Sequence, residues 1–161
     1  MTDPRAFFLT WRTYGTWLHG DPRGSVDRQH NVYETPLLPA SPARRMATQT
    51  RMEHPPVTLS TSARELVARV IATHCDIRRW ELYVQAVRSN HAHVVVAFAG
   101  LGPDAMMSQF KAYATRALRD AGTIGPRAPA WAEGGSTRYL WNAEQVGTAC
   151  TYVQEGQDEA H

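Results

Sequence analysis

Two histidines and a tyrosine are the residues of this chain whose types and spacing could carry chemistry. His91 and His93 stand two apart in an apolar, β-branched run that predicts a strand over 91–98. Alternate side chains of a strand share one face, so both imidazoles are expected on the same side. Two imidazoles so placed can hold one divalent metal ion. The alternative is a pair of partly buried, hydrogen-bonded histidines without metal.

Tyr152 lies in a segment with helical apolar spacing at positions 146, 149, 150 and 153. It falls about a third of a turn off the centre of that apolar stripe, at roughly 100° per residue. A phenol placed there could attack phosphorus if a metal polarises the phosphate. The alternative is a partly exposed packing tyrosine. Tyr113 is the competing tyrosine, and its place on the apolar stripe of a helix over 104–121 predicts that it belongs to the core.

Basic residues are nearly all arginine, because 16 of the 17 are Arg and Lys111 is the single lysine. The predicted helix over 104–121 carries a polar side that could track phosphates, or could be an ordinary solvated face. A lone lysine in an arginine-rich chain suggests a position that needs a compact charge. The candidate nucleic-acid contacts are Lys111, Thr115, Arg116 and Arg119 on this helix, with Arg12 and Arg88 flanking the histidine pair.

The elements that must position these residues follow from periodicity and capping. Strands are expected over 5–11, 80–87, 91–98 and 138–141, and helices over 62–79, 104–121 and 143–155. Ser62 and Glu65 form a capping-box pattern for the first helix, Gly122 ends the second, and Asn142 caps the third. The core order βαββαβ predicts an α+β, ferredoxin-like antiparallel sheet with two helices on one face. The last helix would then cover the open face, toward which His91 and His93 point.

The chain is long enough for one domain over 1–161 with an insertion. Residues 19–60 hold six of the ten prolines and are expected to form that insertion or arm, with a short helix over 42–52. No run of 18 apolar residues and no signal-peptide pattern occurs, so we expect no membrane partner and a cytoplasmic location. Cys75 and Cys150 are expected to be reduced rather than disulfide-bonded.

In this order, the motifs resemble those of the single-tyrosine HUH transposases, and most closely the REP-associated tyrosine transposases of the insertion-sequence 200/605 group. The resemblance runs from about residue 7 to residue 157, apart from much of 19–60. The segments that carry it are Asn90–Val96 with its paired histidines, Phe110–Lys111, Leu140–Asn142 and Tyr152–Val153.

The resemblance implies a metal-dependent enzyme that cleaves and rejoins single-stranded DNA at hairpin-flanked sites. His91 and His93 would bind Mg²⁺ or Mn²⁺, and Tyr152 would form a covalent 5′-phosphotyrosine. Members of the family act as homodimers on hairpin DNA, and the tyrosine helix often serves the partner's metal site.

One departure concerns the third metal ligand, because the family places Gln or Asn four residues after the tyrosine. Gly156 occupies that position and Gln157 follows it, so the resemblance points to Gln157, with Glu155 as the substitute. A catalytically weakened or inactive hairpin-binding protein on the same fold is therefore the second hypothesis. A ferredoxin-like protein with structural histidines and no nucleic acid is the third.

Overall fold

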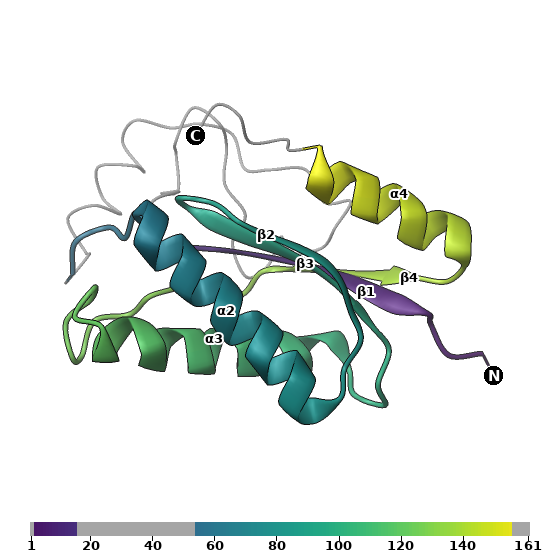
Figure 1. Ribbon diagram of the computed structural model, residues 1–161, viewed down its shortest axis with the longest axis horizontal. Helices are drawn as coiled ribbons and strands as arrows, with labels where there is room; N and C mark the ends of the chain where they lie inside the picture. The colour runs from purple at the N-terminus through teal and green to yellow at the C-terminus, as the bar shows by residue number, and fades with distance from the viewer. Residues whose placement is uncertain (1, 16–53, 156–161) are drawn as a thin grey trace.

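The computed structural model describes residues 2–15 and 54–155, which form one four-stranded antiparallel sheet and three helices (Figure 1). The strands are β1 (Ala6–Arg12), β2 (Leu82–Val87), β3 (His91–Ala97) and β4 (Ser136–Leu140), in the spatial order β2-β3-β1-β4. The helices are α2 (Thr61–Arg78), α3 (Pro103–Asp120) and α4 (Ala143–Gln154). This is the predicted α+β, ferredoxin-like arrangement with an additional C-terminal helix.

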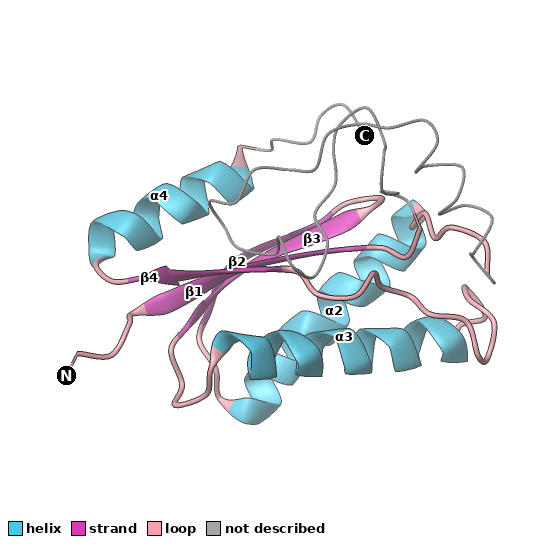
Figure 2. Ribbon diagram, turned by 180° about the vertical axis from the view of Figure 1, so that it is seen from behind, coloured by secondary structure: helices cyan, strands magenta, loops and turns pink. Residues whose placement is uncertain are grey.

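The helices lie on opposite faces of the sheet. Helices α2 and α3 pack together on one face, and α4 crosses the other face over β2 and β3 (Figures 1 and 2). None of the helices among the described residues is both long and apolar enough to cross a membrane.

Strand alternation places the two histidines on the face opposite Ala92, Val94 and Val96, as the sequence predicts, and both faces of the sheet carry an apolar cluster. Ala92, Val94 and Val96 of β3 are fully buried against α2 and α3. On the other face, Val95 packs with Ala149 of α4. His91 and His93 therefore belong to the face that α4 partly covers.

The helix ends confirm two predicted caps and correct one. The Asn142 side chain accepts a hydrogen bond from the Gln145 backbone N–H at 2.9 Å, and Gly122 adopts φ +76° after α3. The first helix begins earlier than the capping-box pattern predicts. Its N-cap is Ser60, whose hydroxyl accepts from the Ala63 backbone N–H at 3.2 Å. Serines and threonines fill positions 58–62, except for Leu59, so the local pattern offers several equivalent caps.

Tyr113 was predicted to be a core residue, and this was wrong. Its side chain is 45% exposed and lies over the His74 ring, with centroids 4.6 Å apart. Ala114 and Phe110 fill the core from α3 instead. Helices α2 and α3 contact each other along a narrower stripe than the apolar spacing suggests, so Tyr113 is left at the edge of their interface.

The observed strands β2 and β4 begin at other residues than the sequence predicts. β2 begins at Leu82 rather than at position 80, because the Trp80 N–H bonds to the Cys75 carbonyl at the end of α2. β4 begins at Ser136, which pairs with Thr10 of β1, two residues before the predicted start.

Residues 57–59, the last part of the arm predicted over 19–60, bond to the chain next to strands β1 and β3. The Val57 N–H bonds to the Tyr14 carbonyl at 2.8 Å and the Leu59 N–H to the Ser89 carbonyl at 2.7 Å. The predicted short helix over 42–52 lies outside the described residues. Both cysteines are free thiols, Cys75 buried and Cys150 partly buried; burial raises the pKa of Cys75 to about 11.

Candidate functional site

The two histidines lie at the start of β3 with their rings side by side. The ring centroids of His91 and His93 are 4.7 Å apart. The Nδ1 atom of His91 is 2.7 Å from Oδ1 of Asn90, and the Nδ1 atom of His93 is 2.8 Å from the Thr10 hydroxyl. Because an amide oxygen only accepts, His91 donates from Nδ1, which leaves the lone pair on Nε2. A hydrogen bond to one ring nitrogen fixes the orientation of the imidazole, and with it the direction of the other nitrogen.

The surroundings of His93 keep its ring neutral. Burial, followed by the positive charges of Arg12 and Arg88, lowers the pKa of His93 from 6.5 to about 4. Only the neutral imidazole ligates a metal, so near pH 7 this side chain is in the binding form without losing a proton.

The lowered pKa of His93 predicts a loss of stability in mild acid. Between pH 6.5 and about 4 the unfolded chain binds a proton that the folded chain does not, so the free energy of unfolding falls as pH falls through this range. The full shift corresponds to a loss on the order of 3 kcal/mol. Urea unfolding of the metal-free protein at several pH values measures it. His93→Gln should flatten the pH dependence in this window, and an unchanged slope in that variant would assign the loss to other groups.

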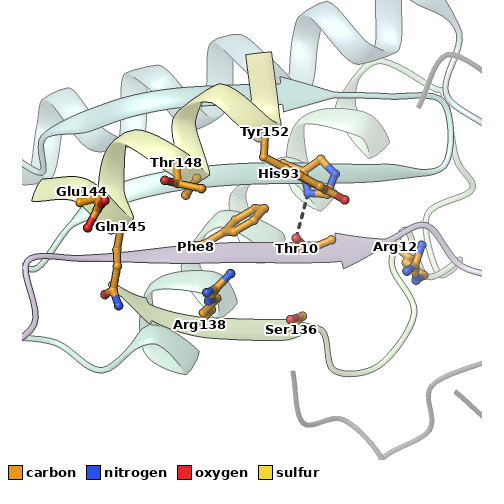
Figure 3. A pocket seen from close by; sticks show the side chains of 11 residues that line it. Phe8, Thr10, Arg12, His93, Ser136, Arg138, Glu144, Gln145, Thr148 and Tyr152 are labelled. Carbon is orange, nitrogen blue, oxygen red and sulfur yellow. Dashed lines mark hydrogen bonds between the residues drawn. The ribbon is translucent and has the colours of Figure 1, made fainter. Parts of the chain in front are cut away.

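Tyr152 lies beside His93 on the same chain. Its side chain is 44% exposed, so it is not a core tyrosine. The rings of Phe8, His93 and Tyr152 form a triangle, with centroid separations of 5.5 Å for Phe8–His93, 5.8 Å for Phe8–Tyr152 and 5.9 Å for His93–Tyr152. Figure 3 shows the tyrosine reaching down from α4 to the imidazole. The phenol and one of the candidate metal ligands therefore face the same space.

That space is a groove of about 460 Å³ between α4 and the strands β1 and β4 (Figure 3). The strands supply its floor and α4 its wall. Its lining consists of Phe8, Thr10, Arg12, His93, Ser136, Arg138, Glu144, Gln145, Thr148, Ala149 and Tyr152.

The donor set fits a divalent ion only in part. Two imidazoles with oriented rings suit such an ion. Among residues 2–15 and 54–155, however, no group of three or more His, Cys, Asp or Glu side chains is placed to hold a metal. Glu155 is exposed at the end of α4, and Gln157 lies outside the described residues. The third protein ligand thus stays a prediction.

Lys111 is engaged within the protein. Its ammonium donates to the carbonyl oxygens of Ala132, at 3.1 Å, and Gly134. The Lys111 carbonyl in turn accepts from the Trp131 indole N–H at 3.1 Å. Burial lowers the pKa of Lys111, and the charge of Glu133 partly opposes this shift. These bonds connect α3 to the loop before β4. A compact ammonium that donates to two carbonyl oxygens explains structurally why this position holds the single lysine. Phosphate contact by Lys111 stays a prediction.

Replacing this ammonium should destabilise the fold. Lys111→Met leaves two carbonyl oxygens without their donor, and we expect the free energy of unfolding to fall by about 1.5–3 kcal/mol. Urea denaturation measures this change. Arg116→Met is the matched control, since Arg116 is exposed on the same helix and should cost less than about 0.5 kcal/mol. Equal stability of the two variants would contradict the structural role.

The other candidate contacts fall into two groups. Arg12 lines the groove, and the charges of Arg12 and Arg88 act on His93, so these two arginines belong to the histidine site. The residues of α3 lie on the opposite face of the sheet. There the Thr115 hydroxyl donates to the Lys111 carbonyl at 2.7 Å, and Arg119 donates to the Ala128 carbonyl at 3.1 Å. Any DNA contact by these α3 residues would therefore lie away from the groove, and such contact stays a prediction.

Sequence reasoning missed several side chains of the site. Thr10 and Asn90 orient the two imidazoles, and Phe8 and Arg138 line the groove. Asn90 precedes the histidine pair and could have been found as a partner of His91. Thr10 could not, because it meets His93 only through the pairing of β1 with β3.

Comparisons with known proteins yield structural matches only. No family model and no curated protein matches the sequence. A solved structure of a REP-associated tyrosine transposase bound to a REP hairpin aligns at 11% identity and TM-score 0.49, over 94% of this chain and 65% of that one. The chain thus spans less than two thirds of that protein. A candidate transposase from Deinococcus radiodurans R1 aligns at 9% identity and TM-score 0.51, over 96% of this chain and 92% of that one. The chain shares its fold with this second structure.

Proposed function

We propose that this protein is a metal-dependent tyrosine transposase that nicks and rejoins single-stranded DNA at hairpin-flanked sites. The observation that supports this most is the meeting of His93 and Tyr152 in one groove, with ring centroids 5.9 Å apart. The resemblance of the motifs and the fold shared with a candidate transposase agree with it. The REP hairpin in the other aligned structure belongs to that protein, and hairpin DNA is proposed here as the substrate class.

The reaction would run through Tyr152. The phenol oxygen attacks the scissile phosphorus, the bond from phosphorus to the 3′ oxygen breaks, and a 3′-hydroxyl leaves with a proton taken up from the phenol or from solvent. The product is a 5′-phosphotyrosine ester, which a 3′-hydroxyl can attack in the reverse sense to rejoin strands. A divalent ion held by His91 and His93 would polarise the phosphate. Arg12 and Arg88 would add positive charge where the transition state gathers negative charge.

Thr10 and Asn90 would act on the histidines rather than on DNA. Their hydrogen bonds to the two Nδ1 atoms fix the rings before any metal arrives. Tyr152 and His93 lie within reach on one chain, so we propose that a single chain can assemble its own site, within the homodimer that the resemblance implies.

A covalent adduct tests the proposal. The protein is incubated with Mn²⁺ and a pool of labelled hairpin oligonucleotides that carry random single-stranded flanks. We expect a denaturation-resistant protein–DNA species that disappears on chelation with EDTA. Hairpin binding without an adduct under any divalent metal would instead favour a non-catalytic binding protein, and absence of salt-dependent binding to single strands would exclude both.

A further inference from the structure

Beyond the His93–Tyr152 pair, the groove continues along β1 and β4 and is lined there by side chains of both strands and of α4. Its floor is made of two cross-strand pairs, Thr10 with Ser136 and Phe8 with Arg138. Its wall is one side of α4, where Glu144, Thr148 and Tyr152 follow each other at intervals of four residues and so share a helix face. Figure 3 shows these side chains converging on the space between helix and strands.

The chemistry of the lining matches a single nucleotide. The guanidinium groups of Arg12 and Arg138 suit phosphate, and the Phe8 ring suits stacking on a base. The hydroxyl groups of Ser136 and Thr148 and the Gln145 amide suit the polar edges of that base. Among the described residues that line the groove, Glu144, at the N-terminal end of α4, is the one acid. A volume of about 460 Å³ falls within the roughly 300–1,000 Å³ of small-molecule sites.

Gln145 is held in place for this role. Its Oε1 accepts a hydrogen bond from the Trp141 backbone N–H at 2.6 Å, which turns the oxygen toward the backbone and fixes the direction of the NH₂ group, the donor of the side chain. Figure 3 shows the side chain extending from α4 toward β4, across the end of the groove. A fixed donor can distinguish bases by their acceptor positions.

We propose that this groove binds the nucleotide adjacent to the scissile phosphate, with Arg138 on its phosphate group and Gln145 at the edge of its base. The proposal rests on the proposed function, since Tyr152 marks where the scissile phosphate lies. It adds a strand-binding subsite and a residue that selects the base next to the nick.

Salt-dependent binding tests the phosphate contact without cleavage. The probes are short, fluorescein-labelled single-stranded oligonucleotides of random sequence, mixed with the Tyr152→Phe protein in EDTA and followed by anisotropy over a series of salt concentrations. Adding Arg138→Gln should reduce the slope of log K against log salt by about 0.7, the value for one single-strand phosphate contact. The control is Arg69→Gln, an exposed arginine of α2 on the other face of the sheet, which should leave the slope unchanged.

The outcomes distinguish a wrong groove assignment from a wrong proposed function. If the parent protein binds single strands and Arg138→Gln keeps its slope, the groove assignment is wrong while the proposed function stands. If the parent protein shows no salt-dependent binding at all, the proposed function itself fails.

Sequencing of covalent adducts tests the base contact. With flank-randomised hairpins and otherwise wild-type protein, we expect a base preference at one position next to the nick. Gln145→Met should flatten that preference and leave the other positions unchanged. An identical profile in both proteins would overturn the role of Gln145 in base selection.

Discussion

Tyr152→Phe is expected to abolish covalent capture of DNA and to lower the nicking rate by at least about 10⁴-fold, as loss of the nucleophile does in enzymes that form a covalent intermediate. Phenylalanine keeps the ring that packs on Phe8 and His93 but has no oxygen to attack phosphorus. Because the tyrosine side chain is 44% exposed, the fold should be unaffected. Denaturing gels of the protein with labelled hairpin DNA measure the adduct, and thermal unfolding checks the fold.

The matched control for this prediction is Tyr113→Phe. Tyr113 is about equally exposed, at 45%, but lies on α3 beside His74, on the other face of the sheet. We expect wild-type adduct formation in this variant. An adduct that survives in Tyr152→Phe and disappears in Tyr113→Phe would move the nucleophile to α3 and refute the groove as the reaction site.

His93→Gln is expected to raise the Mn²⁺ concentration needed for half-maximal nicking by at least about 100-fold. The substitution keeps a side chain of similar size and removes the imidazole. Thr10→Val removes only the hydroxyl that lies 2.8 Å from Nδ1 of His93, and such orienting partners are typically worth about 10–100-fold in metal affinity or activity. Metal titrations of the nicking rate at saturating DNA measure both effects.

The relative size of the two effects tests the role of His93. If His93 is a metal ligand and Thr10 orients it, the Mn²⁺ requirement should rise more in His93→Gln than in Thr10→Val, with both proteins folded. A buried structural histidine predicts lower stability in both variants with no change in the metal dependence. If the metal titration of His93→Gln overlays that of the wild type, the metal role of His93 is wrong.

Local patterns in the sequence were sufficient for the order of elements and for the face that carries the histidines. Ala92, Val94 and Val96 must be buried on one side of β3, which places His91 and His93 on the other side. The cap at Asn142 was equally clear, since a polar residue before an apolar-periodic run has few competitors.

Local patterns failed where several choices are equivalent along the chain. Ser60 and Ser62 are both good N-caps, and only the path of the chain from Leu59 into the core selects Ser60. Tyr113 fits the apolar spacing of its helix, yet the width of the interface between α2 and α3 leaves it exposed. Both outcomes depend on how neighbouring elements pack.

The chemistry at the site divides in the same way. The sequence by itself determined that two imidazoles share a strand face and that Tyr152 lies off the core stripe of its helix, because helical and strand periods are properties of the backbone. Only the tertiary structure decided that Thr10 meets His93, that Arg138 lines the same groove as Tyr152, and that Lys111 bonds to the loop before β4. Thr10 and His93 are 83 positions apart and Lys111 and Ala132 are 21 apart, so these contacts exist only once strand pairing and helix docking have brought distant segments together.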